Sequence, residues 1–377
     1  MIVTPENILI VNTRLIGDVL LSTPLIQLIS QQFQAASIDF LVNRGTGEFL
    51  EKDPRIRHVI YSDKWQKTSK GLESGYLLRL LRRYDLAITL NTADRGAVAV
   101  VVAGRFYRVG FYQQDKAVAS WLRKLLYTHP LELCVDQHIV LANRQIATTL
   151  GIPCEWLEVK LFWDESDQRR VAELLASNGL PDAPYLVIHP FARWRYKYWE
   201  TQRFAEVSDR LARLHQLRPI WTSSPDKKEI ALLQEAAAGC SIKPLLLPGT
   251  LSLNQMGCLL KGAALYIGLD TAITHIAAST GVPMVALYGP TELWRWHPWD
   301  NDCSLKEPVK NGYRGTIRTK RIVTLQAACE HYPCIRPHCY SEVENPCMMA
   351  LTEDDVCAEA SRLLETTKMK RQNDHAV

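Results

Sequence analysis

The stretch from Leu265 to Trp299 most constrains the fold of this chain, because two apolar runs in it flank a segment with helical spacing. Leu265–Leu269 and Met284–Tyr288 are short continuous apolar runs, which are typical of buried parallel strands. Between them, Thr271–Thr280 has helical periodicity and ends just before Gly281. The stretch therefore predicts a strand–helix–strand unit in an open α/β sheet.

The start of this predicted helix is a candidate anion site. Asp270 and Thr271 supply helix-start signals directly after the first strand. The free amides and the dipole at such a helix start favour negative charge, and open α/β sheets bind ligands outside the carboxyl ends of their strands. The alternative is an ordinary turn in which Asp270 caps the helix. Spacing alone favours neither interpretation.

Strands and helices alternate along most of the chain, and the alternation restarts at Tyr185–His189 after a Gly-Leu-Pro-Asp-Ala-Pro break. A chain of 377 residues also suits two domains better than one core. We therefore expect an α/β protein with two doubly wound parallel sheets, whose strand ends face a cleft. The predicted parts are an N-terminal domain over 1–170, a C-terminal domain over 180–350, a helix over 351–366 and a disordered tail over 367–377.

Composition narrows the class of protein. Hydrophobic residues make up 47% of the chain, which is typical of a globular protein, and no run of 18 apolar residues would span a bilayer. The amino end has no basic stretch ahead of a long apolar core, so it predicts no secretory signal and a cytoplasmic location.

The net charge of +4 is mild but unevenly distributed. One basic cluster contains Arg79, Arg82 and Arg83, and a second basic stretch covers residues 306–321. Solvated surface explains any single cluster, whereas together they suit an acidic acceptor or an anionic membrane surface. Zinc-finger spacing and basic heptad helices are missing from the sequence, so nucleic acid is not an expected partner.

Four of the ten cysteines are clustered with two histidines near the carboxyl end, namely Cys329, Cys334, Cys339 and Cys347. The group contains enough thiols to bind zinc, but its spacings miss the compact pattern of two cysteines two residues apart. The alternative is a loop of reduced cysteines interrupted by prolines. No other metal site is expected.

Gly17 and Asp18 follow the first predicted strand, Ile8–Val11, at the turn into a helix predicted over 19–33. Glycine permits a tight turn, and Asp18 is a candidate general base for an acceptor hydroxyl. Its alternative role is to cap the helix. A position at a helix start stabilises the carboxylate and weakens the base, so burial would have to offset that effect.

The segment Pro190–Trp199 alternates cations with aromatic residues, and in an extended loop this places Arg193, Arg195 and Lys197 on one side. Three cations on one side suit a phosphate-bearing ligand, and they would compensate the charge of Asp270. An amphipathic edge segment is the alternative. On the helix predicted over 271–280, Thr271 and His275 share a face near the anion site.

The turn before the helix predicted over 227–238 contains Asp226. An acidic residue at this position accepts hydrogen bonds from ribose hydroxyls in nucleotide-binding folds. Capping of the helix is the equally simple alternative. The glycines Gly45 and Gly47 follow the second strand rather than the first, and no third glycine completes a dinucleotide fingerprint.

With these residues in place, the chain resembles the bacterial lipopolysaccharide heptosyltransferases of glycosyltransferase family 9, most of all the heptosyltransferase III branch. The resemblance reaches to about residue 360, and its motifs are ILIVNTRLIGDVLLSTPLI, HPFARWRYKYWETQRFAEV and GLDTAITHIAASTGVPMVALYGPTELWRWHPW. It implies a GT-B fold, with two Rossmann-like domains around a central cleft. It also implies inverting transfer of L-glycero-D-manno-heptose from ADP-heptose to the lipopolysaccharide inner core, at the cytoplasmic face of the inner membrane, without a cofactor.

The resemblance also assigns roles to residues of this chain. Asp18 matches the general base, and Lys197 matches a lysine on the donor phosphates. The resemblance implies further donor contacts at Asp226, Leu251, Asp270, Thr271, Ala272 and His275. The pattern of cations described above adds Arg193 and Arg195 to the donor contacts. The acceptor is expected to contact Gly17, Asp18 and the cluster Arg79, Arg82 and Arg83.

Three other functions compete with heptosyl transfer. The same fold uses other nucleotide-activated sugars, since few contacts select the donor sugar. A catalytically silent nucleotide-sugar binder is a second alternative, although intact Asp18, Lys197 and His275 argue against it. A Rossmann dehydrogenase is the weakest alternative, because the glycine fingerprint is incomplete.

Overall fold

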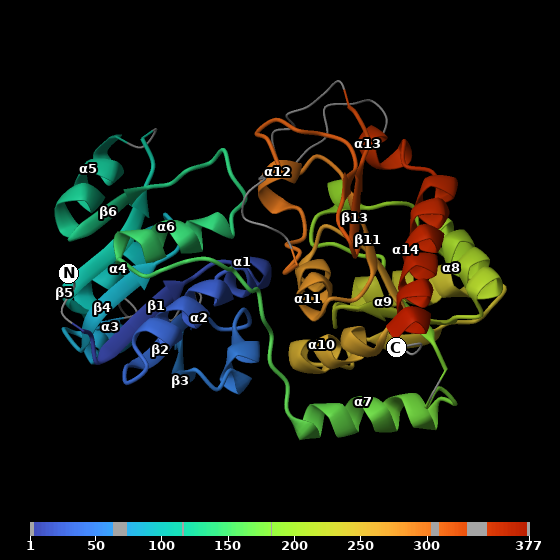
Figure 1. Ribbon diagram of the computed structural model, residues 1–377, viewed down its shortest axis with the longest axis horizontal. Helices are drawn as coiled ribbons and strands as arrows, with labels where there is room; N and C mark the ends of the chain where they lie inside the picture. Colours follow the sequence, from blue (N-terminus) through green and yellow to red (C-terminus); the bar gives the residue numbers. More distant parts are fainter. Residues whose placement is uncertain are drawn as a thin grey trace. The chain divides into compact units, whose positions relative to one another are not determined.

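The computed structural model describes residues 4–62, 74–114, 117–181, 183–302, 309–329 and 345–374. They form two compact units that divide between Phe162 and Trp163 (Figure 1). The division precedes the predicted boundary at residue 170, because α7 (Glu165–Ser177) packs against α10 (Leu253–Gly262) in the second unit. Among the helices of these described ranges, not one is both long and apolar enough to cross a membrane.

The first unit is a parallel sheet of six strands in the order β3-β2-β1-β4-β5-β6. The strands are β1 (Asn7–Asn12), β2 (Ser37–Asn43), β3 (Ile56–Ser62), β4 (Tyr84–Thr89), β5 (Gly104–Tyr112) and β6 (His129–Glu132). The connecting helices are α1 (Ile16–Leu20), α2 (Thr23–Gln32), η1 (Glu48–Lys52), α3 (Ser74–Leu80), α4 (Asp94–Ala103), α5 (Ala117–Leu126) and α6 (Leu141–Thr149).

The second unit has seven strands in the order β12-β13-β11-β10-β7-β8-β9, and all neighbours are parallel except β12 and β13. Its strands are β7 (Tyr185–His189), β8 (Arg218–Ser223), β9 (Leu245–Pro248), β10 (Leu265–Leu269), β11 (Met284–Tyr288), β12 (Ile317–Arg318) and β13 (Ile322–Gln326). Besides α7 and α10, its helices are η2 (Arg195–Lys197), α8 (Thr201–His215), α9 (Lys227–Ala238), α11 (Ala272–Thr280), α12 (Leu293–Trp296), α13 (Pro346–Met349) and α14 (Glu353–Asp374).

The central strands are apolar on both faces because helices cover both sides of each sheet. The side chains of β10 and β11 are buried throughout, as a parallel sheet requires. Apart from the short edge strand β12, both sheets have the strand order of a dinucleotide-binding fold. In that order the connections reverse direction between β1 and β4 in the first unit, and between β7 and β10 in the second. Ligands bind at such switch points, outside the carboxyl ends of the strands.

One predicted helix is found as two. The sequence predicts a helix over 19–33, whereas α1 ends at Leu20 and α2 begins at Thr23. The hydroxyl of Ser22 donates to the Val19 carbonyl at 2.6 Å, and the hydroxyl of Thr23 donates to the Leu20 carbonyl at 2.8 Å. Pro24 has no amide proton for that carbonyl, so side-chain hydroxyls replace backbone donors and the helix restarts.

The carboxyl-terminal helix also departs from the expectation. α14 packs against α8 (Figure 1) and continues to Asp374, beyond the predicted end near residue 366. Leu363 and Leu364 anchor it in the core, and the sequence after them contains no glycine or proline that would stop a helix. Residues 367–374 of the predicted disordered tail are therefore helical.

Candidate active site

The carboxyl edge of the first sheet is lined by asparagines that follow its apolar strands. Asn12 ends β1, Asn43 ends β2, and Asn91 lies two residues beyond β4. All three are buried. The side-chain amide of Asn91 donates to the Asn12 carbonyl oxygen at 3.2 Å, which links the two strands of the switch point. The sequence signal for this layer is an asparagine at or just after the end of three strands, and sequence reasoning did not connect the three.

Asn12 fixes the turn that contains Gly17 and Asp18. Its amide nitrogen donates to the backbone carbonyl of Asp18 at 2.9 Å, and its carbonyl oxygen accepts from the amide of Arg14 at 3.2 Å. Gly17 lies in the first turn of α1 with helical backbone, so the turn does not depend on a left-handed glycine. Asp18 is thus held at the carboxyl edge by the strand that precedes it.

Asp18 is a largely enclosed carboxylate with one cationic partner. Its side chain is 14% exposed, and Arg14 Nε donates to its Oδ1 at 2.8 Å. Burial raises the pKa of Asp18, and Arg14 together with the amide of Leu15 only partly opposes that rise. Leu15 is the N-cap, so Asp18 assists the helix start from within the first turn rather than capping it. Burial thus offsets the weakening expected at a helix start.

The cluster of Arg79, Arg82 and Arg83 lies at the opposite edge of this sheet. Arg82 and Arg83 directly precede β4, and an Arg82 guanidinium nitrogen donates to the Gly104 carbonyl at the start of β5 at 2.7 Å. The six residues of β4 separate this edge from the carboxyl edge, a distance of roughly 17–20 Å. The structure therefore does not bring these arginines into one site with Gly17 and Asp18.

In the second unit, a buried ion pair occupies the switch point. Lys197 follows β7, Asp270 follows β10, and the Lys197 ammonium donates to Asp270 Oδ2. The side chains are 12% and 8% exposed. Burial alone would raise the pKa of Asp270, but Lys197, the hydroxyl of Thr291 and nearby His275 outweigh it and hold that pKa below its usual value. Lys197 is thus the cation that compensates Asp270.

The segment around Lys197 is a tight turn, which corrects the extended loop expected from the sequence. The amide of Lys197 donates to the Trp194 carbonyl at 3.0 Å and closes the short helix η2. The rings of Trp194 and Tyr196 stack at 6.2 Å instead of alternating with cations across a strand. Arg193 lies over the Trp194 ring and is exposed. Of the three cations, Lys197 is the one whose ammonium contacts Asp270.

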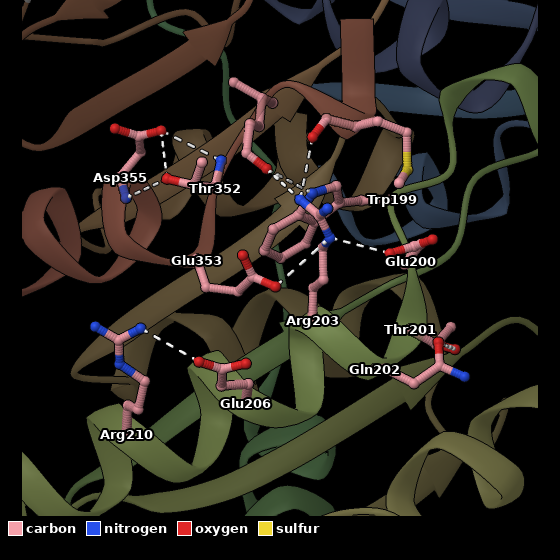
Figure 2. A network of polar contacts seen from close by, with 12 residues as sticks. Trp199, Glu200, Thr201, Gln202, Arg203, Glu206, Arg210, Thr352, Glu353 and Asp355 are labelled. Atoms are coloured by element: carbon pink, nitrogen blue, oxygen red, sulfur yellow. Dashed lines mark hydrogen bonds and ion pairs between the residues drawn. The ribbon is translucent and has the colours of Figure 1, made fainter. Parts of the chain in front are cut away.

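Residues far along the chain hold this turn. The side-chain amide of Asn345 donates to the Arg195 carbonyl at 3.1 Å, and buried Trp199 donates from Nε1 to the Leu351 carbonyl at 3.1 Å. Figure 2 shows Arg203 beside Trp199, between Glu200 and Glu353. Arg203 also donates to the carbonyls of the residues before α14. The carboxyl-terminal segment therefore positions the lysine turn.

The loop after β11 contributes a second support. Gln326, at the end of β13, donates to the backbone carbonyls of Gly289 and Thr291 at 2.7 and 2.8 Å. Held in this way, the Thr291 hydroxyl donates to Asp270 Oδ2 at 2.5 Å. Sequence reasoning missed Thr291, Gln326 and Asn345, because nothing local marks them as neighbours of Asp270.

The start of α11 is capped by Thr271 and not by Asp270. The Thr271 side chain is the N-cap and accepts from the Thr274 amide at 3.4 Å, and Ala272 is the first helical residue. This settles the alternative in which Asp270 serves as the cap. Asp270 instead orients Lys197 beside the helix start.

His275 is buried one turn into α11. Burial lowers its pKa to about 4, with Lys197 adding to the effect and Asp270 opposing it, so the ring is neutral at pH 7. Its Nδ1 is enclosed and has no hydrogen-bond partner in the described structure. A neutral ring with an unpaired nitrogen suits a hydrogen bond to a ligand, but not the compensation of a phosphate charge.

Acid is expected to destabilise the second unit through His189, His275 and His297. Burial lowers the pKa of each to about 4, against about 6.5 in an unfolded chain. Below about pH 6.5 the unfolded state therefore binds protons that the folded state excludes, and stability falls as the pH falls towards 4. Near pH 5 the expected loss of unfolding free energy is about 2 kcal/mol for each histidine. Urea unfolding at several pH values checks this expectation.

A matched pair of variants tests this origin. His189→Gln removes one buried histidine and should reduce the pH dependence, whereas His58→Gln on the exposed part of β3 should leave it unchanged. Equal urea midpoints at pH 5 and pH 7.5 in the unaltered chain would contradict the expectation.

The two predicted nucleoside contacts, Asp226 and Leu251, lie at the carboxyl edge of the second sheet, after the strands β8 and β9. Asp226 follows β8 and caps α9 by accepting from the amides of Lys228 and Glu229 at 2.9 and 3.2 Å. Its carboxylate therefore caps the helix, as the alternative interpretation predicted, and the residue is exposed. Leu251 follows β9, and Gly249 (φ +60°) lies so close to Pro225 that a Cβ would collide with it. The two loops thus lie side by side.

The cysteine cluster is only partly described. Cys347 is buried in the core of the second unit, and Cys329 packs against the same core. Cys334 and Cys339 lie outside the described residues. Within the described ranges no group of three histidine, cysteine or acidic side chains could hold a metal ion. The zinc hypothesis for the four cysteines stays a prediction.

Comparison with solved structures confirms the predicted fold. The chain resembles the structure of Escherichia coli ADP-heptose lipopolysaccharide heptosyltransferase II with a TM-score of 0.70 at 18% identity, over 96% of this chain and 99% of that one. It resembles Escherichia coli heptosyltransferase WaaC with ADP with a TM-score of 0.67 at 19% identity, over 96% and 99%. These likenesses show a GT-B arrangement of two Rossmann-like sheets.

Sequence comparison identifies the family. The sequence pattern of glycosyltransferase family 9 (heptosyltransferase) matches residues 77–314. Lipopolysaccharide heptosyltransferase 3 of Escherichia coli is 31% identical over 297 residues, which cover 77% of this chain and 85% of that protein. The resemblance noted in the sequence is thereby confirmed, and the chain is a transferase that belongs to glycosyltransferase family 9, the heptosyltransferases.

Proposed function

We propose that this protein transfers L-glycero-D-manno-heptose from ADP-heptose to the lipopolysaccharide inner core, with inversion at the transferred sugar. The observation that carries the proposal is the buried Lys197–Asp270 pair beside the start of α11, at the switch point of the second sheet. The relative solved with ADP and the 31% identical heptosyltransferase 3 support this donor and acceptor. In this proposal the first unit binds the acceptor and the second binds the ADP-sugar.

The strand order of the second sheet suggests how the donor lies. Asp270, Lys197, Asp226 and Leu251 follow β10, β7, β8 and β9, which are consecutive neighbours in the sheet. Neighbouring strands are about 4.8 Å apart. We place the diphosphate at Lys197 and the start of α11, the ribose near Asp226 and the adenine near Leu251. Exposed Arg193 and Arg195 supply further positive charge at the diphosphate end.

The chemistry needs a stabilised leaving group and an activated hydroxyl. Lys197 and the first amides of α11 would stabilise charge on the departing diphosphate, and neutral His275 would add a hydrogen bond to the donor. Asp18, whose pKa is raised by burial, would accept the proton of the attacking hydroxyl. Inversion follows from attack on the face opposite the diphosphate. The residues supply these functions themselves, so the proposal includes no cofactor.

Lipopolysaccharide cores are assembled on a lipid anchor, so we place the enzyme peripherally at the cytoplasmic face of the inner membrane. Of the basic stretch at 306–321, Arg314 donates to the Cys329 carbonyl, Arg318 pairs with Glu359, and Arg321 donates to the Gly281 carbonyl. These contacts hold three of its cations within the second unit, which favours another surface for membrane contact.

Mass spectrometry of the reaction product tests the proposal. Purified protein is incubated with ADP-heptose and lipopolysaccharides truncated at defined core positions, and one acceptor is expected to gain the mass of one heptose. A panel of other ADP- and nucleotide-activated sugars is the control for donor choice. Transfer from a different donor would favour the related function, and donor binding without any transfer would favour a silent binder.

A further inference from the structure

The helix α5 of the first unit, labelled in Figure 1, has a row of exposed apolar side chains. Val118, Trp121, Leu122 and Leu125 are 75%, 62%, 43% and 66% exposed. Their spacing of three, four and seven residues places them on one helix face. A surface helix normally directs such a face to the core, whereas α5 directs its apolar face to the solvent.

Polar residues of α5 occupy the inner face instead. The hydroxyl of buried Ser120 donates to the Gln113 carbonyl, and buried Arg123 donates to the Thr92 carbonyl and to Asp94 Oδ1, both at 2.6 Å. Turning the helix to bury its apolar face would break both contacts of the Arg123 guanidinium, with the Thr92 carbonyl and with Asp94. The exposed row is therefore a fixed feature of the helix. Isolated exposed leucines are ordinary, but a contiguous row with a tryptophan marks an interaction surface.

Cations border this apolar face. The exposed basic residue of α5 is Lys124, whose ammonium lies 4.3 Å from the centre of the Tyr112 ring, and the helix contains no acidic residue. At the end of the helix, Arg108 donates to the Leu126 carbonyl at 2.8 Å. Burial, and then the charge of Arg82, lowers the pKa of Arg108, so Arg82 lies close enough to add to the same positive region.

We propose that α5 binds the surface of an anionic bilayer, with Trp121, Leu122 and Leu125 in the interface and the neighbouring cations on lipid headgroups. The inference rests on the proposed function, because it brings the enzyme to a lipid-anchored acceptor. Ten residues of helix are about 15 Å long, too short to span a bilayer but long enough to lie in its interface. With α5 on the bilayer, the basic cluster at Arg82 would contact lipid headgroups. This role does not require the cluster to lie near Asp18, which is at the opposite edge of the sheet.

Vesicle sedimentation of the full chain tests this surface. The unaltered protein should bind vesicles of phosphatidylglycerol and phosphatidylethanolamine more tightly than vesicles of phosphatidylcholine. Leu122→Gln/Leu125→Gln should weaken binding to the anionic vesicles at least about tenfold, from the apolar area that no longer leaves water. Lys124→Gln should weaken it about fivefold, and only for the anionic vesicles. Leu214→Gln, at an equally exposed leucine on α8, is the matched control and should bind as before.

Two results would overturn the proposal. One is unchanged vesicle binding by the double variant. The other is a dimer of the unaltered protein that the double variant abolishes, without vesicle binding by either, since the face would then join two copies. A delipidated soluble acceptor separates this proposal from the proposed function. The unaltered protein and the double variant should glycosylate this acceptor equally. If the unaltered protein does not glycosylate it, the result contradicts heptosyl transfer and leaves membrane docking unaffected.

Discussion

Replacing Asp18 with asparagine is expected to lower kcat for heptosyl transfer by about a hundredfold to ten-thousandfold, the usual contribution of a general base. Asparagine keeps the shape of the side chain and its contact with the amide of Leu15 but cannot accept a proton. The KM for ADP-heptose should change little, because the proposed donor site belongs to the second unit. Steady-state kinetics with ADP-heptose and a truncated lipopolysaccharide measure both constants.

A second variant, Arg14→Gln, tests the charge of Asp18 rather than its presence. Arg14 opposes the rise in the pKa of Asp18, so its removal should move the acid limb of the kcat/KM profile to higher pH. Below that pKa the carboxyl is protonated and inactive as a base, so the rate rises with pH. Near-unaltered turnover of Asp18→Asn would remove the assigned base, and an unmoved acid limb in Arg14→Gln would show that another group titrates.

Replacing Lys197 with methionine is expected to cost about 3–5 kcal/mol of folding stability in the second unit, because it leaves Asp270 buried without its cation. It should also weaken ADP binding by roughly ten- to a hundredfold, the value of a hydrogen bond to a charged group. Urea unfolding measures the first effect, and isothermal titration with ADP measures the second. Lys243→Met, which removes an exposed lysine bonded to the Ala238 carbonyl, should change both little.

The double variant Lys197→Met/Asp270→Asn separates the two effects. Removing both charges restores most of the stability, because no unpaired buried charge remains. ADP binding should stay weak, since the phosphates still lack their ammonium. If the double variant recovers stability and ADP affinity together, the lysine serves the fold alone and has no role at the donor.

Much of the fold could be predicted because the signals are local. The apolar runs of β7, β10 and β11 and the helix-start and helix-stop residues around α9 and α11 lie within the segments that they specify. The sequence predicts one helix where two occur, because the hydroxyls of Ser22 and Thr23 compete with backbone amides for the carbonyls of the preceding turn. The strand β6 and the helix α5 were missed as well, although the apolar residues of α5 have helical spacing.

The sequence by itself determined which residues are candidates for the chemistry, whereas tertiary structure decided which of them lie together. Asp18, Lys197, Asp270 and His275 stand out by residue type and position after a strand. Their partners do not, because Lys197 and Asp270 are 73 residues apart and meet only when β7 and β10 become neighbours. The parallel direction of β1 and β4 also placed Arg82 at the edge opposite Asp18. Sequence spacing cannot reveal such neighbours, because they meet only when distant segments bury their apolar faces against one another.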